Sequence, residues 1–127
     1  MKKQIKQVLE FQKAFGQGVR TSPSPYLNKD KINLRYKLMR EENKEYLIGA
    51  KNGDLEEIAD ALGDMLFVLC GTIIEHGMQD KIVEVFEEIY RSNMSKLGEN
   101  GKPIFREDGK ILKGPNYSPP NLTEILK

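Results

Sequence analysis

The chain is 127 residues long, the length of one ordinary domain, and it is large enough to bury an apolar core without cross-links. Charged residues make up 31% of it, yet the formal net charge is only +1, so no excess of charge points to nucleic acid or to an acidic partner. The single cysteine excludes a disulfide within the chain, and the single histidine excludes a multi-histidine metal site.

No apolar run approaches the ~20 residues that span a bilayer, so we expect no membrane partner. The N-terminal stretch "MKKQIKQVLEFQK" also lacks the continuous apolar core of a signal peptide. Together with the lone cysteine, these observations predict a cytoplasmic protein.

Helical periodicity begins at once in the chain. Ile5, Val8 and Phe11 recur at three- and four-residue steps and predict a first helix, which Gly16 ends. The stretch "TSPSPYL" at 21–27 contains two prolines and predicts a loop.

Three further helices follow at short intervals. Asn28 is a typical N-cap for a second helix that runs to about Lys51. Asp54 is a suitable cap for a third helix over 55–75, and a fourth is predicted over about 79–96. Short connections between amphipathic helices predict an all-α fold, an antiparallel four-helix bundle.

The character of the sequence changes after Gly98. Turn signals and prolines replace helical periodicity, and the pieces 103–105 and 110–112 flank an Asp-Gly turn that predicts a small hairpin. We therefore expect a helical domain over 1–97 and an irregular, basic C-terminal arm over 98–127 that belongs to the same domain.

The second predicted helix carries its acids in an unusual place. Relative to Leu38, a rotation of about 100° per residue puts Glu42 about 40° to one side and Glu45 about 20° to the other. Leu34 shares this sector, so these two glutamates continue a line of leucines instead of opposing it. Glu41 lies about 60° away, at the edge of the sector.

The third predicted helix repeats this pattern. Asp64 lies about 20° and Asp60 about 60° from Glu57, and Val68 and Gly71 prolong the same stripe. The stretch "MLFVLCGTII" that follows is apolar all round, so we expect this helix to be largely buried. Carboxylates on a buried helix need cations, because unpaired buried charge is costly.

Carboxylate oxygens from two neighbouring helices are the ligands that Mg²⁺ prefers, and Mn²⁺ is possible in the same site. A ferritin-like di-iron site would need a Glu-x-x-His pair, which the sequence lacks. The alternative interpretation is a pair of solvated acidic faces, partly neutralised by Arg40 and Lys44.

Other polar residues are candidates for binding a substrate. Asn93 lies on the apolar stripe of the fourth helix, about 20° from Phe86, with Lys96 at the edge of that sector. Both would also be ordinary residues at a helix end. The arm adds Lys113 and Tyr117, and it would serve as a basic lid, as a dimer arm or as a solvated end.

The motifs together resemble a known superfamily. Glu41-Glu42-x-x-Glu45 followed by Glu57-x-x-Asp60 is similar to the EExxE…ExxD pattern of the all-α nucleoside triphosphate pyrophosphohydrolases, which include MazG and phosphoribosyl-ATP pyrophosphohydrolase. The likeness covers helices two to four, and "SNMSKL…GKPIFREDGKILKGPNYSPP" is similar to small stand-alone MazG-like members.

This resemblance implies Mg²⁺-dependent cleavage of a nucleoside triphosphate between its α- and β-phosphates, which gives a monophosphate and pyrophosphate in nucleotide-pool house-cleaning. The implied metal ligands are Glu42, Glu45, Glu57 and Asp60. A departure is that "ALGDMLF" resembles the "ELGDLLF" of MazG and would make Asp64 the aspartate ligand, so we expect Asp64 to be an added ligand or a supporting acid. Glu41 is the candidate general base.

Two other functions remain open. One is hydrolysis of phosphoribosyl-ATP itself, and the other is a non-catalytic helical module that binds metal or nucleotide without turnover. The resemblance also implies a homodimer or homotetramer, because a four-helix chain with an inward acid cluster needs a second copy to close its pocket.

Overall fold

The computed structural model describes residues 1–127 and contains four helices and no strand, which confirms the all-α class. The helices are α1 (Lys2–Ala14), α2 (Lys29–Lys51), α3 (Leu55–Glu75) and α4 (Ile82–Met94). None of them is both long enough and apolar enough to cross a membrane.

Contacts within the chain group it into two compact units, Met1–Asp80 and Lys81–Lys127. The first unit holds α1, α2 and α3, while α4 belongs with the C-terminal arm. The predicted division into a helical domain over 1–97 and an arm over 98–127 stays a prediction.

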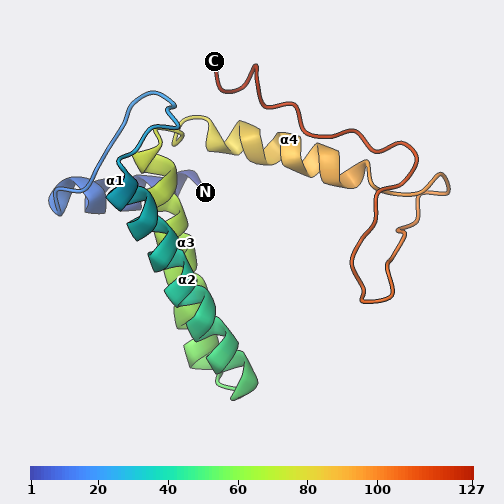
Figure 1. Cartoon of the computed structure of the whole chain (residues 1–127), viewed down its shortest axis with the longest axis horizontal. Coiled ribbons are helices and arrows are strands. Elements are labelled where there is room, and N and C mark those ends of the chain that lie inside the picture. The colour runs from blue at the N-terminus through green and yellow to red at the C-terminus, as the bar shows by residue number, and fades with distance from the viewer. The chain divides into compact units, whose positions relative to one another are not determined.

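Helices α2 and α3 form an antiparallel hairpin, visible as the two long helices that run side by side in Figure 1. Both predicted caps are present: the Asn28 side chain accepts a hydrogen bond from the Lys31 amide at 2.8 Å, and Asp54 accepts one from the Glu57 amide at 3.1 Å. The connection turns at Gly53, whose φ of 64° favours glycine over any residue with a Cβ.

The register of this hairpin follows from three contacts. Lys31 Nζ lies 3.4 Å from the Glu75 carboxylate, Arg35 Nη2 donates to the Val68 carbonyl at 2.7 Å, and Gly49 lies against Glu57. In each pair the two residue numbers add up to nearly the same total, as they must in an antiparallel pair. The same register places Glu42 opposite Asp64.

Helix α1 packs on α3 near the C-terminal end of α3. The rings of Phe11 and Phe67 meet edge to face at 5.0 Å, and Val8 and Ile74 are buried in the core. This arrangement explains why only part of α3 is covered.

The expectation that α3 is largely buried is therefore wrong for the part of the helix that precedes Cys70. Buried residues gather from Cys70 onward, whereas Leu62 is 48% exposed and Leu66 is 39% exposed. The sequence shows that a helix is apolar all round, but it does not show how many neighbours the chain supplies to cover it.

Helix α4 is shorter than predicted, because residues 79–81 form a turn and the helix begins only at Ile82. After it, the predicted hairpin is reduced to one antiparallel bridge between Phe105 and Ile111. The arm then returns alongside α4, as Figure 1 shows. The Ser92 hydroxyl donates to the Ser118 carbonyl at 2.8 Å and fastens it there.

Candidate functional site

Glu42 is the most unusual carboxylate of the α2–α3 hairpin. Its side chain is half-buried, and its Oε2 atom is fully buried and accepts no hydrogen bond. A buried acceptor without a donor costs on the order of 1–3 kcal/mol, so it needs a proton or a cation.

The neighbours of Glu42 make that need stronger. Burial, then the adjacent Glu45 carboxylate, and then Asp64 and Asp60 raise the pKa of Glu42 from 4.5 to about 7. These four acids come from two helices, so the structure brings together most of the side chains that the sequence pattern selected.

Glu57 lies apart from this group, in the first turn of α3 and nearer the closed end of the hairpin. It packs against Gly49, where a Cβ on the glycine would lie 2.9 Å from Glu57 Cγ. Glu57 and Asp60 also line a cavity of about 250 Å³ with Asp54 and Glu56, so Asp60 connects the cavity to the Glu42 group.

Glu41, the candidate base, is exposed to solvent and is not among the carboxylates that raise the pKa of Glu42. The line of α2 that faces α3 runs through Lys31, Arg35 and Leu38 to Glu42, whereas Leu34, expected on it, is 43% exposed. The role of Glu41 stays a prediction.

The acid group suits a hard divalent cation in its chemistry. No three acidic, histidine or cysteine side chains converge closely enough to hold a metal ion as they stand. The unpaired Oε2 of Glu42 and the mutual repulsion of four carboxylates are nevertheless features that a bound Mg²⁺ would relieve. The chemistry of this donor set therefore fits such an ion.

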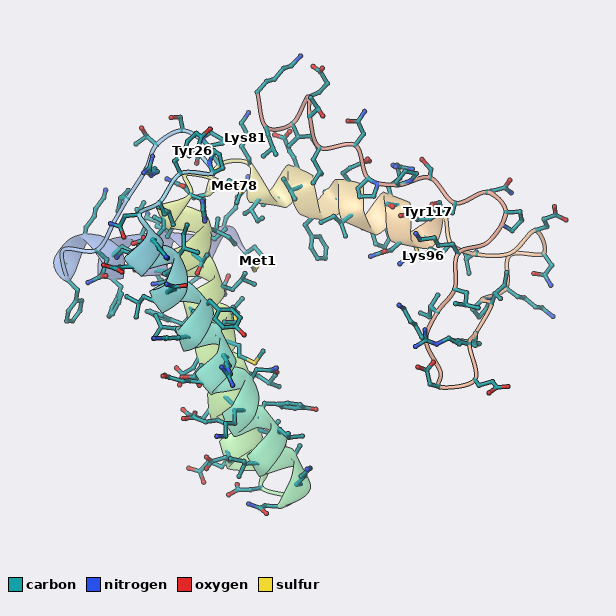
Figure 2. The ribbon with its side chains drawn as sticks, in the orientation of Figure 1. Met1, Tyr26, Met78, Lys81, Lys96 and Tyr117 are labelled. Atoms are coloured by element: carbon teal, nitrogen blue, oxygen red, sulfur yellow. The ribbon has the colours of Figure 1, made fainter.

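The predicted substrate-binding residues all belong to the second unit. Asn93 is exposed in the last turn of α4, and the Lys96 carbonyl accepts a hydrogen bond from the Gly114 amide at 2.8 Å. Lys113 Nζ lies 4.8 Å from the centre of the Tyr117 ring, a cation–π pair. Figure 2 shows Lys96 and Tyr117 near the C-terminal end of α4, so all four residues lie at this end of the second unit.

Sequence reasoning missed a second charged group, at the other end of the hairpin. Glu75 is only 1% exposed, and its Oε1 atom accepts hydrogen bonds from the Gly18 amide at 2.9 Å and Gln12 Nε2 at 3.3 Å. Arg35, beside it, donates to Thr72 Oγ1 at 3.0 Å. Burial lowers the pKa of the Arg35 guanidinium, and the nearby Glu75 carboxylate partly offsets that effect.

A signal for this group was present in the sequence. Lys31 and Arg35 precede Leu38 at helical spacing, and Glu75 follows Asp64 by eleven residues, which is about 20° of rotation on the helix. The acid line and the buried charges are therefore two ends of one stripe.

Comparison with known proteins identifies a family for most of the chain. Residues 8–93 match the sequence model of the phosphoribosyl-ATP pyrophosphohydrolase family (PRA-PH), a range that runs from α1 to the last turn of α4 and includes every carboxylate discussed above. A search of curated proteins found no match.

Proposed function

Because the chain belongs to the phosphoribosyl-ATP pyrophosphohydrolase family, within the MazG-like all-α superfamily, we propose that it is a Mg²⁺-dependent nucleoside triphosphate pyrophosphohydrolase. The bond broken is the one between the α- and β-phosphates, and the products are a nucleoside monophosphate and pyrophosphate.

One observation carries the proposal within this family. Glu42 holds a buried, unpaired carboxylate oxygen among Glu45, Asp60 and Asp64, and a structural role does not account for such an arrangement. A carboxyl whose pKa is raised by burial and by neighbouring acids, as that of Glu42 is, is typical of functional sites.

The side chains would divide the work as follows. Glu42, Glu45, Asp60 and Asp64 would hold Mg²⁺, with Glu57 at the edge of the site. Mg²⁺ bound there would offset the negative charge of the triphosphate and lower the pKa of a water molecule. Glu41 is the candidate to accept a proton at its exposed carboxylate.

The basic residues of the second unit complete the proposal. Lys96 and Lys113 would donate to phosphate oxygens, and the Asn93 amide is a further donor. Tyr117, already paired with Lys113, would present its ring beside the substrate.

The test is a panel of ribo- and deoxyribonucleoside triphosphates incubated with pure protein and Mg²⁺, with pyrophosphate as the readout. We expect release of pyrophosphate from at least one of them, and its loss in Glu42→Gln and Asp60→Asn. Nucleotide binding without pyrophosphate from any substrate would instead support a non-catalytic binding module.

The family match itself favours a second candidate, phosphoribosyl-ATP. The same assay with that substrate decides between the two. A value of kcat/KM for phosphoribosyl-ATP far above that for every nucleoside triphosphate would replace the first candidate by the second.

We also propose that two or four copies assemble. Leu62, Leu66 and Leu69 recur at helical spacing on α3 and are all exposed. Light scattering on a size-exclusion column should therefore give at least twice the mass of one chain, and a monomer at all concentrations would contradict this.

A further inference from the structure

A second cavity lies in the first unit, where the loop after α1 meets the start of α2 and the end of α3. Its volume is about 370 Å³, and none of its residues belongs to the acid group described above. The side chains that matter for its chemistry are Val19, Arg20, Leu27, Lys31 and Glu75. A cavity of this size is large enough for a nucleobase.

A buried carboxylate, that of Glu75, lines this cavity. Oε1 is satisfied by Gly18, Gln12 and Lys31, but Oε2 accepts no hydrogen bond from the chain, although the residue is only 1% exposed. Gly18 is needed for this arrangement, since a Cβ there would lie 2.8 Å from Glu75 Oε1. A built-in acceptor without a donor therefore borders the cavity.

The groups beside that acceptor define the ligand. Lys31 Nζ lies 3.4 Å from Glu75 Oε1, so an acceptor and an ammonium donor stand side by side. Guanine presents two adjacent N–H donors, at N1 and N2, next to its O6 acceptor. Adenine and cytosine present one N–H donor beside a ring nitrogen, and uracil presents one between two carbonyls.

The remaining side chains suit the same base. Arg20 is a further donor at the wall, and arginine commonly binds O6 and N7 of guanine. Val19 and Leu27 supply apolar surface for the faces of a ring. The cavity therefore matches guanine through these side chains as well as through the Glu75 carboxylate.

The position of the cavity connects it with the acid group. Asp64 and Glu75 lie about three turns, or about 16 Å, apart on nearly the same side of α3. An extended triphosphate with its nucleoside has a comparable reach. Arg35 stands between the two ends, where Gly71 leaves room for its guanidinium.

We infer that this cavity binds the base of a guanine nucleotide, with Glu75 as the residue that determines base preference. The inference rests on the proposed function for the identity of the substrate class, but the cavity itself can be tested without turnover.

The first test is binding of nucleoside monophosphates by calorimetry to the full chain. GMP should bind at least tenfold more tightly than IMP, which lacks the 2-amino group, and than AMP or UMP. Glu75→Gln should weaken GMP binding at least tenfold, to the level of IMP. The control Glu10→Gln changes an exposed carboxylate of the same unit and should leave GMP binding unchanged.

The outcomes separate this inference from the proposed function. Pyrophosphate release from several triphosphates with no preference of GMP over IMP overturns the guanine site and leaves the proposed function standing. Preferential GMP binding without hydrolysis of any triphosphate supports the guanine site and overturns the proposed function. If circular dichroism shows that Glu75→Gln is unfolded, the comparison of GMP with IMP on the natural chain decides alone.

Discussion

At the scale of single residues, Glu42 determines how the acid group responds to pH. Its pKa in the folded chain is raised to about 7, so the carboxyl is mostly protonated at pH 6 and mostly ionised at pH 8. The Mg²⁺ that we propose for this group would have to displace that proton. We expect the Mg²⁺ affinity to rise between pH 6 and pH 8 and calorimetry near pH 7 to detect proton release. An affinity that does not change with pH in the natural chain would contradict the grouping of these acids.

The same residue predicts the pH dependence of stability without metal. Because the folded pKa lies above the ordinary value of 4.5, the contribution of Glu42 is fully present below about pH 4.5 and is lost as the pH rises through about 7. Urea denaturation should show a weaker fall in stability between pH 5 and pH 8 for Glu42→Gln than for the natural chain. Glu10→Gln is the matched control, and equal slopes for all three proteins would refute the prediction.

At the scale of elements, the α2–α3 hairpin depends on close packing at Gly49. An added Cβ would lie 2.9 Å from Glu57 Cγ and 3.3 Å from the Ile58 amide nitrogen, which cannot move without shifting α3. Overpacking of this kind costs about 1–3 kcal/mol, which outweighs the gain in helix propensity, so Gly49→Ala should lower the free energy of unfolding.

The chain offers a matched control for this substitution. A Cβ at Gly63, in the middle of α3, meets nothing within 4 Å. Gly63→Ala should therefore stabilise the chain by up to about 1 kcal/mol through helix propensity alone. Changes of opposite sign in the free energy of unfolding, measured by urea denaturation, would support the hairpin register. Equal changes for the two variants would contradict it.

The same hairpin shows what the sequence allows one to predict. The capping residues Asn28 and Asp54 specify helix starts locally, so both starts were predicted correctly. Helical angles likewise grouped Glu42 with Glu45, because rotation per residue is a property of one helix. The distance of Glu57 from that group depends on the register between two helices, which no local signal encodes. The burial of Glu75 depends on a loop more than fifty residues away in sequence, at Gly18.

At the scale of the whole molecule, the charges needed for the proposed reaction are divided between the two units. The carboxylates lie in residues 1–80, and the cations proposed to bind phosphate lie in residues 81–127. Within the second unit, the arm that carries Lys113 and Tyr117 is held to α4, so we expect these contacts to affect the proposed binding of substrate.

Two hydroxyl contacts hold the arm to the end of α4. Ser92 Oγ donates to the Ser118 carbonyl at 2.8 Å, and the Ser118 amide donates to Ser95 Oγ at 2.9 Å. The Ser95 hydroxyl is itself oriented by donating to the Ser92 carbonyl at 2.6 Å. Replacing Ser92, or Ser95 just after α4, by alanine removes hydrogen bonds worth about 1 kcal/mol each, which corresponds to about fivefold in an equilibrium. We expect Ser95→Ala to raise KM for the substrate several-fold with little change in kcat, because the acid group is untouched.

Hydrogen exchange of the arm distinguishes this effect from a general loss of stability. Amides of residues 114–121 should exchange faster in Ser95→Ala, while those of α2 and α3 keep their protection. Ser95→Thr retains the hydroxyl and should restore both KM and protection, and Thr123→Ala, at an exposed position near the C-terminus, should change neither. A rise in exchange throughout the chain, or an unchanged KM with a freely exchanging arm, would show that the arm does not position the substrate.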